Sequence, residues 1–156
     1  DPAKYPDEKP AEVSVTDRSS DEWTRFDVEP VADTVGQASI HAMFLYNDIQ
    51  ASGVQTYSYS HPAAVGWEGD ALVPYRNGNQ FGYVWETVWE DESEAREFVD
   101  AYRALLESKG GQLEDGTATI PDASPFGDAF RVTRDGARVR IVNAPSESAL
   151  SAVHGE

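Results

Sequence analysis

The segment from Ser58 to Tyr75, SYSHPAAVGWEGDALVPY, gathers many of the residue types that perform chemistry in proteins. The imidazole of His61 and the carboxylates of Glu68 and Asp70 are ligand types for Zn²⁺, so a zinc site across the fold is one interpretation. Asp70 and Glu86 could instead act as the acid pair of a glycosidase, if folding held their carboxylates about 5 to 9.5 Å apart. Both interpretations need residues that the fold must bring together.

Motif patterns for these reactions are missing from the sequence. His41, His61 and His154 are scattered without HExxH or HxH spacing, so we expect no metal. Cysteine is absent and no GxSxG occurs, so Ser60 beside His61 is a sequence neighbour only. Neither GxxxxGK nor GxGxxG occurs to hold a phosphate, and 28 acidic residues make chance carboxylate pairs expected. We therefore predict no catalytic, cofactor-binding or metal-binding residues and no enzymatic activity.

A structural corner is the interpretation of residues 61–70 that we favour. Pro62 can begin a single helical turn and Gly66 can end it. Trp67 can fill the core, while Asp70 can accept hydrogen bonds from backbone donors. We likewise expect His41 to be partly buried and hydrogen-bonded to backbone.

A helix and a hairpin are predicted on either side of this corner. Asp33 or Thr34 is a candidate N-cap for a helix whose apolar stripe is Val35, Ala38, Ile40, Met43, Phe44 and Ile49. Asn77-Gly78 predicts a tight turn, with both residues at positive φ, between strands at 71–76 and 81–90. In the second strand one face carries the aromatic row Phe81, Tyr83, Trp85 and Trp89. This row could stack on sugar rings, but we predict that it is core, because the next helix offers an apolar face.

The remaining elements complete an α+β pattern. Asp91 as N-cap and Gly110 as stop bound a helix over 92–108, and strands at 129–133 and 138–142 flank a turn at Arg134-Asp135-Gly136. A short helix begins near Pro145-Ser146. The acidic runs 90–92 and 114–116 match no EF-hand loop and are interpreted as solvated surface. We predict an antiparallel sheet with helices packed mainly on one side.

Two regions are expected along the chain, an extended proline-containing arm at 1–34 and a globular α+β domain at 35–156. Glu12 to Thr16, EVSVT, alternates and could add a short edge strand. Trp23 and Phe26 are expected to pin the arm to the domain. We favour docking of the arm on its own domain over exchange with a neighbouring copy.

Charge restricts the classes of partner. The chain has 156 residues and a formal net charge of −16, with 28 acidic residues against 12 basic ones. Such a surface repels nucleic acid, because binding to phosphate requires clustered basic residues. Only three of the bases are lysines, and abundant carboxylates with scarce lysine suit molar salt, where the Debye length is about 3 Å. We therefore predict a salt-adapted protein that binds no nucleic acid.

No apolar run approaches the roughly 18 residues that a membrane-spanning helix needs, and no secretory leader is recognisable at Asp1 to Lys4. Composition therefore leaves a cytoplasmic protein, a mature chain and an excised piece as alternatives.

Several short stretches, taken together, resemble a family of secreted surface proteins of halophilic archaea. They are DRSSDEW at 17–23, TVGQAS at 34–39, HPAA at 61–64, WEGD at 67–70, GYVW at 82–85 with AREF at 95–98, and IVNAP at 141–145. Full-length members of that family carry a signal peptide and an HExxH zinc-peptidase-like domain before this region. The resemblance implies a C-terminal module located outside the cell, and none of the zinc ligands has a counterpart here.

Composition and resemblance together predict a non-catalytic extracellular domain of a halophile's surface protein. Its expected partners are a sister domain, the cell-surface layer or copies of itself. The alternative is the accessory C-terminal domain of a secreted zinc-metallopeptidase-like protein.

Overall fold

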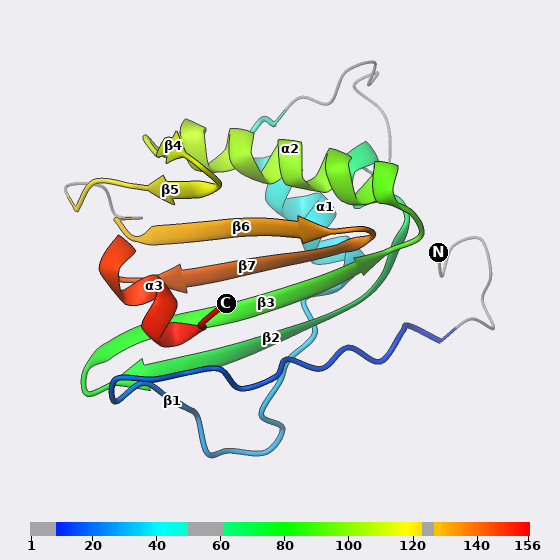
Figure 1. Ribbon diagram of the computed structural model, residues 1–156. Coiled ribbons are helices and arrows are strands. Elements are labelled where there is room, and N and C mark those ends of the chain that lie inside the picture. Colours follow the sequence, from blue (N-terminus) through cyan, green and yellow to red (C-terminus); the bar gives the residue numbers. More distant parts are fainter. Residues whose placement is uncertain (1–8, 50–60, 123–126) are drawn as a thin grey trace.

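A single antiparallel sheet organises the chain (Figure 1). The computed structural model describes residues 9–49, 61–122 and 127–156. Within these residues the sheet has seven strands in the order β1-β2-β3-β7-β6-β5-β4. The strands are β1 Thr24–Arg25, β2 Trp67–Asn77, β3 Gln80–Trp89, β4 Gln112–Glu114, β5 Thr117–Thr119, β6 Ala129–Asp135 and β7 Arg138–Ala144. The predicted α+β class with an antiparallel sheet is confirmed.

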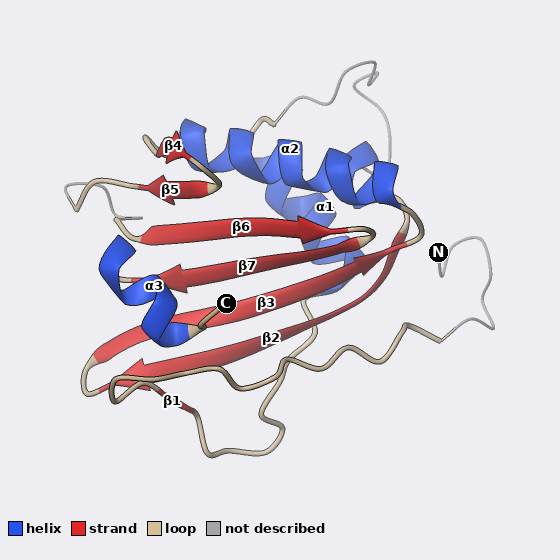
Figure 2. Cartoon of the chain, viewed as in Figure 1, coloured by secondary structure: helices blue, strands red, loops and turns tan. Residues whose placement is uncertain are grey.

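Two helices and a short 3₁₀ turn cover what we call the first face of the sheet (Figure 2). They are α1 Gly36–Tyr46, α2 Glu92–Ser108 and η1 Pro62–Ala64. Phe98 of α2 packs edge-on against Trp85, with ring centroids 5.7 Å apart, and stacks on Trp89 at 4.7 Å. These two tryptophans are core, as predicted. Phe81, at the far end of the same row, is 60% exposed, so the prediction that it belongs to the core is wrong.

The second face carries α3 Glu147–Val153 and the N-terminal arm (Figure 2). Val15 and Trp23 of the arm are buried there, Trp23 to 5% exposure, in a cluster with side chains of the sheet and α3. The sheet and α3 contribute Ala71, Val73, Tyr75, Val84, Ala129, Val142, Ala144, Leu150, Ala152 and Val153. Trp23 therefore fixes the arm on its own domain, as expected. Phe26 lies half-buried, with its ring edge-on to Phe81 at 6.1 Å.

The prediction of a short edge strand at Glu12 to Thr16 is wrong. The strand that pairs with β2 is β1, through Thr24 to Arg76 and Arg25 to Tyr75. Val13 and Val15 both contact the second-face cluster, so the alternating pattern of this segment packs side chains over the sheet instead of pairing its backbone along the edge.

The β2–β3 hairpin forms where predicted but with a different turn. Its strands are longer than expected, and Asn77 pairs with Gln80, so the two-residue loop is Gly78-Asn79. Gly78 has φ +59°, whereas Asn77 and Asn79 have no positive φ. Glycine alone at the first loop position is the pattern of a type II′ turn, so the prediction of two residues at positive φ is wrong.

No helix in the described part of the chain is long and apolar enough to cross a bilayer. Ser60, the sequence neighbour of His61, lies outside the described residues.

Candidate functional site

Asp70 is the centre of the corner at residues 61–70. Its carboxylate accepts hydrogen bonds from the backbone N–H of Val35 at 2.7 Å and of Gly36 at 2.8 Å, where α1 begins. It also accepts one from the indole Nε1 of Trp67 at 2.8 Å. The residue is 5% exposed, and its carboxylate satisfies three donors within the protein. The prediction that Asp70 caps backbone donors is confirmed.

The predicted N-cap of α1 at Asp33 or Thr34 is wrong. The N-cap residue is Val35, and no side chain of its own segment caps the helix. Asp33 instead pairs its backbone with Leu72 of β2, and its Oδ1 accepts a hydrogen bond from Thr34 N at 2.8 Å. The cap comes from the neighbouring strand, which sequence spacing near the helix could not indicate.

His61 and His41 are also held by internal hydrogen bonds. His61 Nδ1 accepts a hydrogen bond from Ala63 N at 3.2 Å, and its Nε2 lies 2.8 Å from the carbonyl oxygen of Ile49. Because a carbonyl can only accept, Nε2 carries the proton and donates it. The backbone N–H of His61 donates to Nδ1 of His41, which is half-buried as predicted.

The candidate acid pair does not form. Asp70 is paired with Thr87 across the β2–β3 ladder, and Ala71 is paired with Glu86. Since neighbouring residues of a strand alternate between faces, Asp70 and Glu86 project from opposite faces of the sheet. Within residues 9–49, 61–122 and 127–156, no three histidine, aspartate or glutamate side chains lie together as a metal-binding group.

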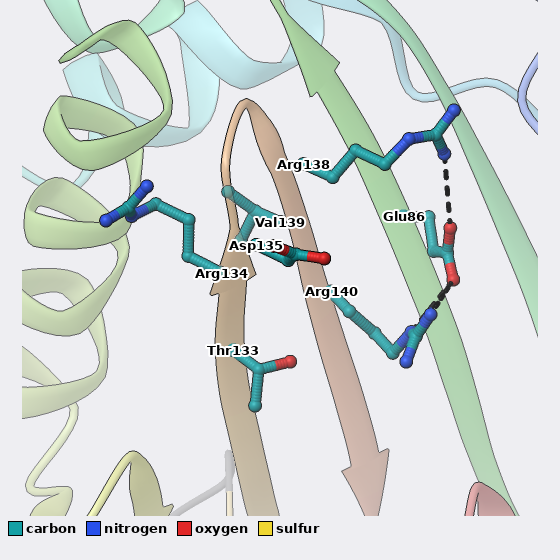
Figure 3. A pocket seen from close by; sticks show the side chains of 7 residues that line it. All are labelled: Glu86, Thr133, Arg134, Asp135, Arg138, Val139 and Arg140. Carbon is teal, nitrogen blue, oxygen red and sulfur yellow. Dashed lines mark hydrogen bonds and ion pairs between the residues drawn. The ribbon is translucent and has the colours of Figure 1, made fainter. Parts of the chain in front are cut away.

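Glu86 lies instead in an arginine cluster on the second face. Arg140 Nε donates to Glu86 Oε1 at 2.8 Å, and Nη2 of the same arginine lies 2.6 Å from that oxygen (Figure 3). Arg138 Nη1 lies 3.7 Å from Glu86 Oε2. The Glu86 side chain is 9% exposed and that of Arg138 is 58% exposed. A buried carboxylate thus holds one guanidinium firmly and a second one loosely.

Strand register explains why these side chains meet. Glu86 on β3 is paired with Arg140 on β7, and Arg140 is paired with Thr133 on β6. One row further along, Arg138 is paired with Asp135. Directly paired residues share a face, so all five side chains point away from the first face. We call this group, Glu86, Thr133, Asp135, Arg138 and Arg140, the open zone.

The open zone lines a pocket of about 170 Å³, together with Val139 and Arg134. Arg134 points toward α2 instead (Figure 3). It donates to Gly136 O at 2.8 Å in the β6–β7 turn and lies 3.7 Å from Glu92 Oε2 of α2. On the same face α3 covers Arg131, whose Nη1 donates to Ser151 Oγ at 3.3 Å. The arm covers β2 on this same second face, at the opposite flank of the open zone from α3. The open zone is the stretch of the second face between these two covers.

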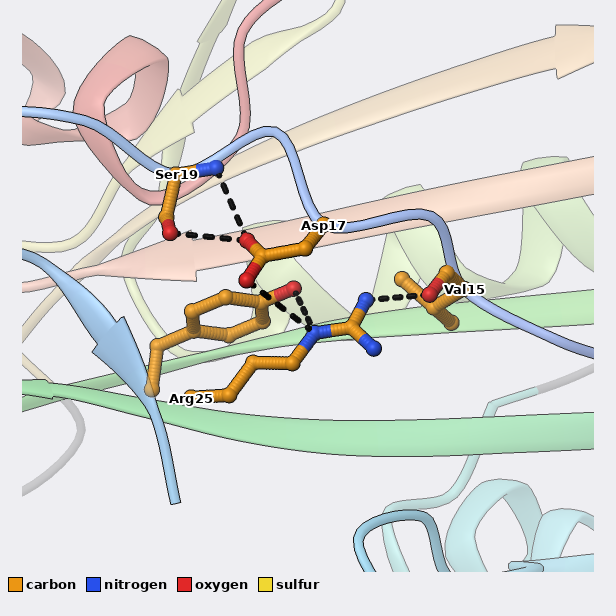
Figure 4. Close-up of polar contacts among 5 residues, drawn as sticks. Val15, Asp17, Ser19 and Arg25 are labelled. Atoms are coloured by element: carbon orange, nitrogen blue, oxygen red, sulfur yellow. Dashed lines mark hydrogen bonds and ion pairs between the residues drawn. The ribbon is translucent and has the colours of Figure 1, made fainter. Parts of the chain in front are cut away.

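Arg25 fastens the arm beside this zone. Its Nε donates to the hydroxyl of Tyr75 at 2.8 Å and lies 3.8 Å from Asp17 Oδ2, while its Nη2 donates to Val15 O (Figure 4). Burial works against ionisation of Asp17, but hydrogen bonds from Ser19 and the charge of Arg25 hold the pKa of its carboxyl below the usual value. Burial raises the pKa of Tyr75, so its hydroxyl stays a neutral partner.

His154 lies at the end of α3 and is 1% exposed, with no hydrogen-bond partner for either ring nitrogen in the described residues. Burial and the charges of nearby arginines lower its pKa from 6.5 to about 4. Those arginines are Arg140, Arg18, Arg131 and Arg25. The second face therefore concentrates guanidinium groups around a neutral imidazole, in a chain whose net charge is −16.

A family model described as a domain of unknown function, DUF8575, matches residues 24–154. The chain belongs to this family. No curated protein and no solved structure matches the chain. The matched region of this DUF8575 protein includes the corner and the whole open zone, and it begins one residue before Arg25.

Proposed function

We propose that this chain is a non-catalytic interaction domain of an extracellular surface protein from a salt-adapted archaeon. It contacts a protein partner, the cell-surface layer or copies of itself. The main support for a non-catalytic role is the hydrogen bonding of Asp70. This carboxylate lies in the segment richest in potentially catalytic residue types, yet it accepts hydrogen bonds from the N-terminus of α1 and from Trp67. The imidazole of His61 is likewise bonded to backbone on both ring nitrogens.

The net charge supports salt adaptation, and the resemblance supports an extracellular location. The net charge of −16 destabilises a compact chain in dilute buffer through self-repulsion, which molar salt screens. The stretches that resemble secreted surface proteins of halophilic archaea include HPAA and WEGD. These two stretches form η1 and the start of β2, so they build the corner.

Saturable attachment to a cell envelope would test the proposal. The fluorescently labelled domain is incubated with purified haloarchaeal envelopes in molar NaCl, and bound label is measured with and without excess unlabelled domain. Sedimentation velocity over a wide concentration range measures self-association in the same buffer. We expect competed retention, concentration-dependent assembly or both. A domain that remains monomeric and shows no competed retention contradicts the interaction role.

The resemblance favours one alternative, an accessory C-terminal domain of a secreted zinc-metallopeptidase-like protein. An HExxH motif encoded upstream in the same gene would support it. Peptidase activity of the full-length protein should then change when this domain is removed. An isolated gene without that motif supports the first proposal.

A further inference from the structure

We infer that the open zone binds an acidic side chain presented by a segment of a partner protein. The inference rests on the proposed interaction role and names the surface and chemistry by which it is carried out. Arginine recognises carboxylates through paired N–H donors in a planar fork, and two guanidinium groups converge here above one buried acid.

Glu86 fixes the position of the Arg140 guanidinium. Both contacts from Arg140 go to Oε1, through Nε and Nη2, so the guanidinium is fixed by its inner edge. Within the described residues, no contact occupies Nη1 of Arg140 or Nη2 of Arg138. The donor on Arg140 is anchored before a ligand arrives, which lowers the ordering cost of binding, while the more exposed Arg138 is held only loosely.

Pocket size points to a single side chain. The volume is about 170 Å³, below the roughly 300–1,000 Å³ typical of sites for organic ligands and cofactors. The hydroxyl of Thr133, which makes no hydrogen bond within the described residues, lies in the same row and adds a donor. A glutamate or aspartate side chain matches this combination of space and donors.

The balance of charge argues for a short acidic segment over a long polyanion. Two arginines and two acids make the open zone neutral, while the chain carries −16, so a nucleic acid would meet repulsion beyond the pocket. Asp135 lies opposite Arg138 and opposes an incoming carboxylate. Removing its charge should therefore strengthen binding of an acid and weaken binding of a base.

NMR titration of the ¹⁵N-labelled protein with a capped peptide of alternating serine and glutamate tests the site. We expect shifts of the arginine Nε–Hε signals of Arg138 and Arg140 and of the backbone amides of Thr133 and Asp135. Arg138→Gln should weaken binding about tenfold, the effect of one charge-assisted hydrogen bond. It keeps the Arg140–Glu86 pair, so the variant should fold. Asp135→Asn should strengthen binding about twofold.

Arg96→Gln on α2, an exposed residue on the far side of the sheet, loses the same charge and should bind as the parent does. Equal binding of a serine–glutamine peptide, unchanged affinity in Arg138→Gln or weakened affinity in Asp135→Asn would each overturn the inference. So would equal shifts with acetate or inorganic phosphate, which would identify a site for free anions. If no peptide binds, this site is wrong, while competed retention on envelopes can still support the interaction role.

Discussion

Asp70→Ala should be among the most destabilising single substitutions in this domain. The change removes the acceptor for two N–H groups at the start of α1 and for the indole of Trp67. Loss of an N-cap costs about 1–2 kcal/mol, and each hydrogen bond to a charged group contributes about 1.5–3 kcal/mol. Water can reach part of the space, so we expect a net loss of about 3–5 kcal/mol, a large share of the roughly 5–15 kcal/mol typical of a domain.

Chemical denaturation in constant molar salt, followed by tryptophan fluorescence, measures this loss. Asp33→Ala is the matched control, because among the described residues the Asp33 side chain bonds only the exposed N–H of Thr34, and the backbone pairing with Leu72 needs no side chain. It should cost less than about 1 kcal/mol. The reasoning is refuted if Asp70→Ala costs less than about 1 kcal/mol or if the two variants are equally destabilised.

Further predictions concern salt, acid, the arm and metal. Tm should rise from low to molar NaCl, because screening relieves repulsion among 28 acids, and a flat or falling Tm would contradict this. His154 has a folded pKa of about 4 against 6.5 unfolded, so stability is full above about pH 6.5 and declines as pH falls toward 4. His154→Leu should flatten that slope in pH-dependent melts, and an unchanged slope would show that another group titrates. Trp23→Ala should cost about 3–5 kcal/mol without changing the oligomeric state, which light scattering checks, and Phe26→Ala should cost less because that ring is only half-buried. Elemental analysis should find no stoichiometric transition metal, and one zinc per chain would make His61 and Asp70 candidate ligands again.

Helix α2 could be predicted in full because its cap, its apolar stripe and its stop are all encoded by neighbouring residues. Helix α2 begins and ends as expected at 92 and 108, because Asp91 Oδ1 caps Ser93 N at 2.7 Å and Glu94 N at 3.1 Å. Gly110 follows with φ +89°. The cap, the apolar stripe and the stop all lie within residues 91–110, so one continuous segment contains every signal that defines this helix.

Strands β4 and β5 were missed although the sequence carries their turn. Asp115 and Gly116 both have positive φ, 46° and 80°, the combination that the sequence predicts for Asn77-Gly78. The strands have three residues each, too few to show alternation. The acidic run at 114–116 also favours the interpretation as solvated surface, so the sequence does not predict a hairpin there. An Asp-Gly pair is as strong a signal for a two-residue hairpin turn as an Asn-Gly pair.

The open zone could be predicted only in part. The strands at 129–133 and 138–142 place Arg138 and Arg140 on one face by simple alternation. Glu86, which fixes Arg140, is 54 residues away in sequence, and the pairing of β3 with β7 brings them together. No local pattern specifies that pairing, so the sequence indicates Glu86 only as a candidate partner of Asp70 and not of Arg140.

Salt also selects which kind of site can work on such a protein. At molar ionic strength the Debye length is about 3 Å, so long-range steering between charged surfaces disappears. Pairs in direct contact persist, and the 2.6 Å approach of Arg140 to buried Glu86 is of that kind. A partner would therefore be held by the geometry of a few desolvated contacts and not by net charge. Its affinity should depend on dissociation rate far more than on association rate.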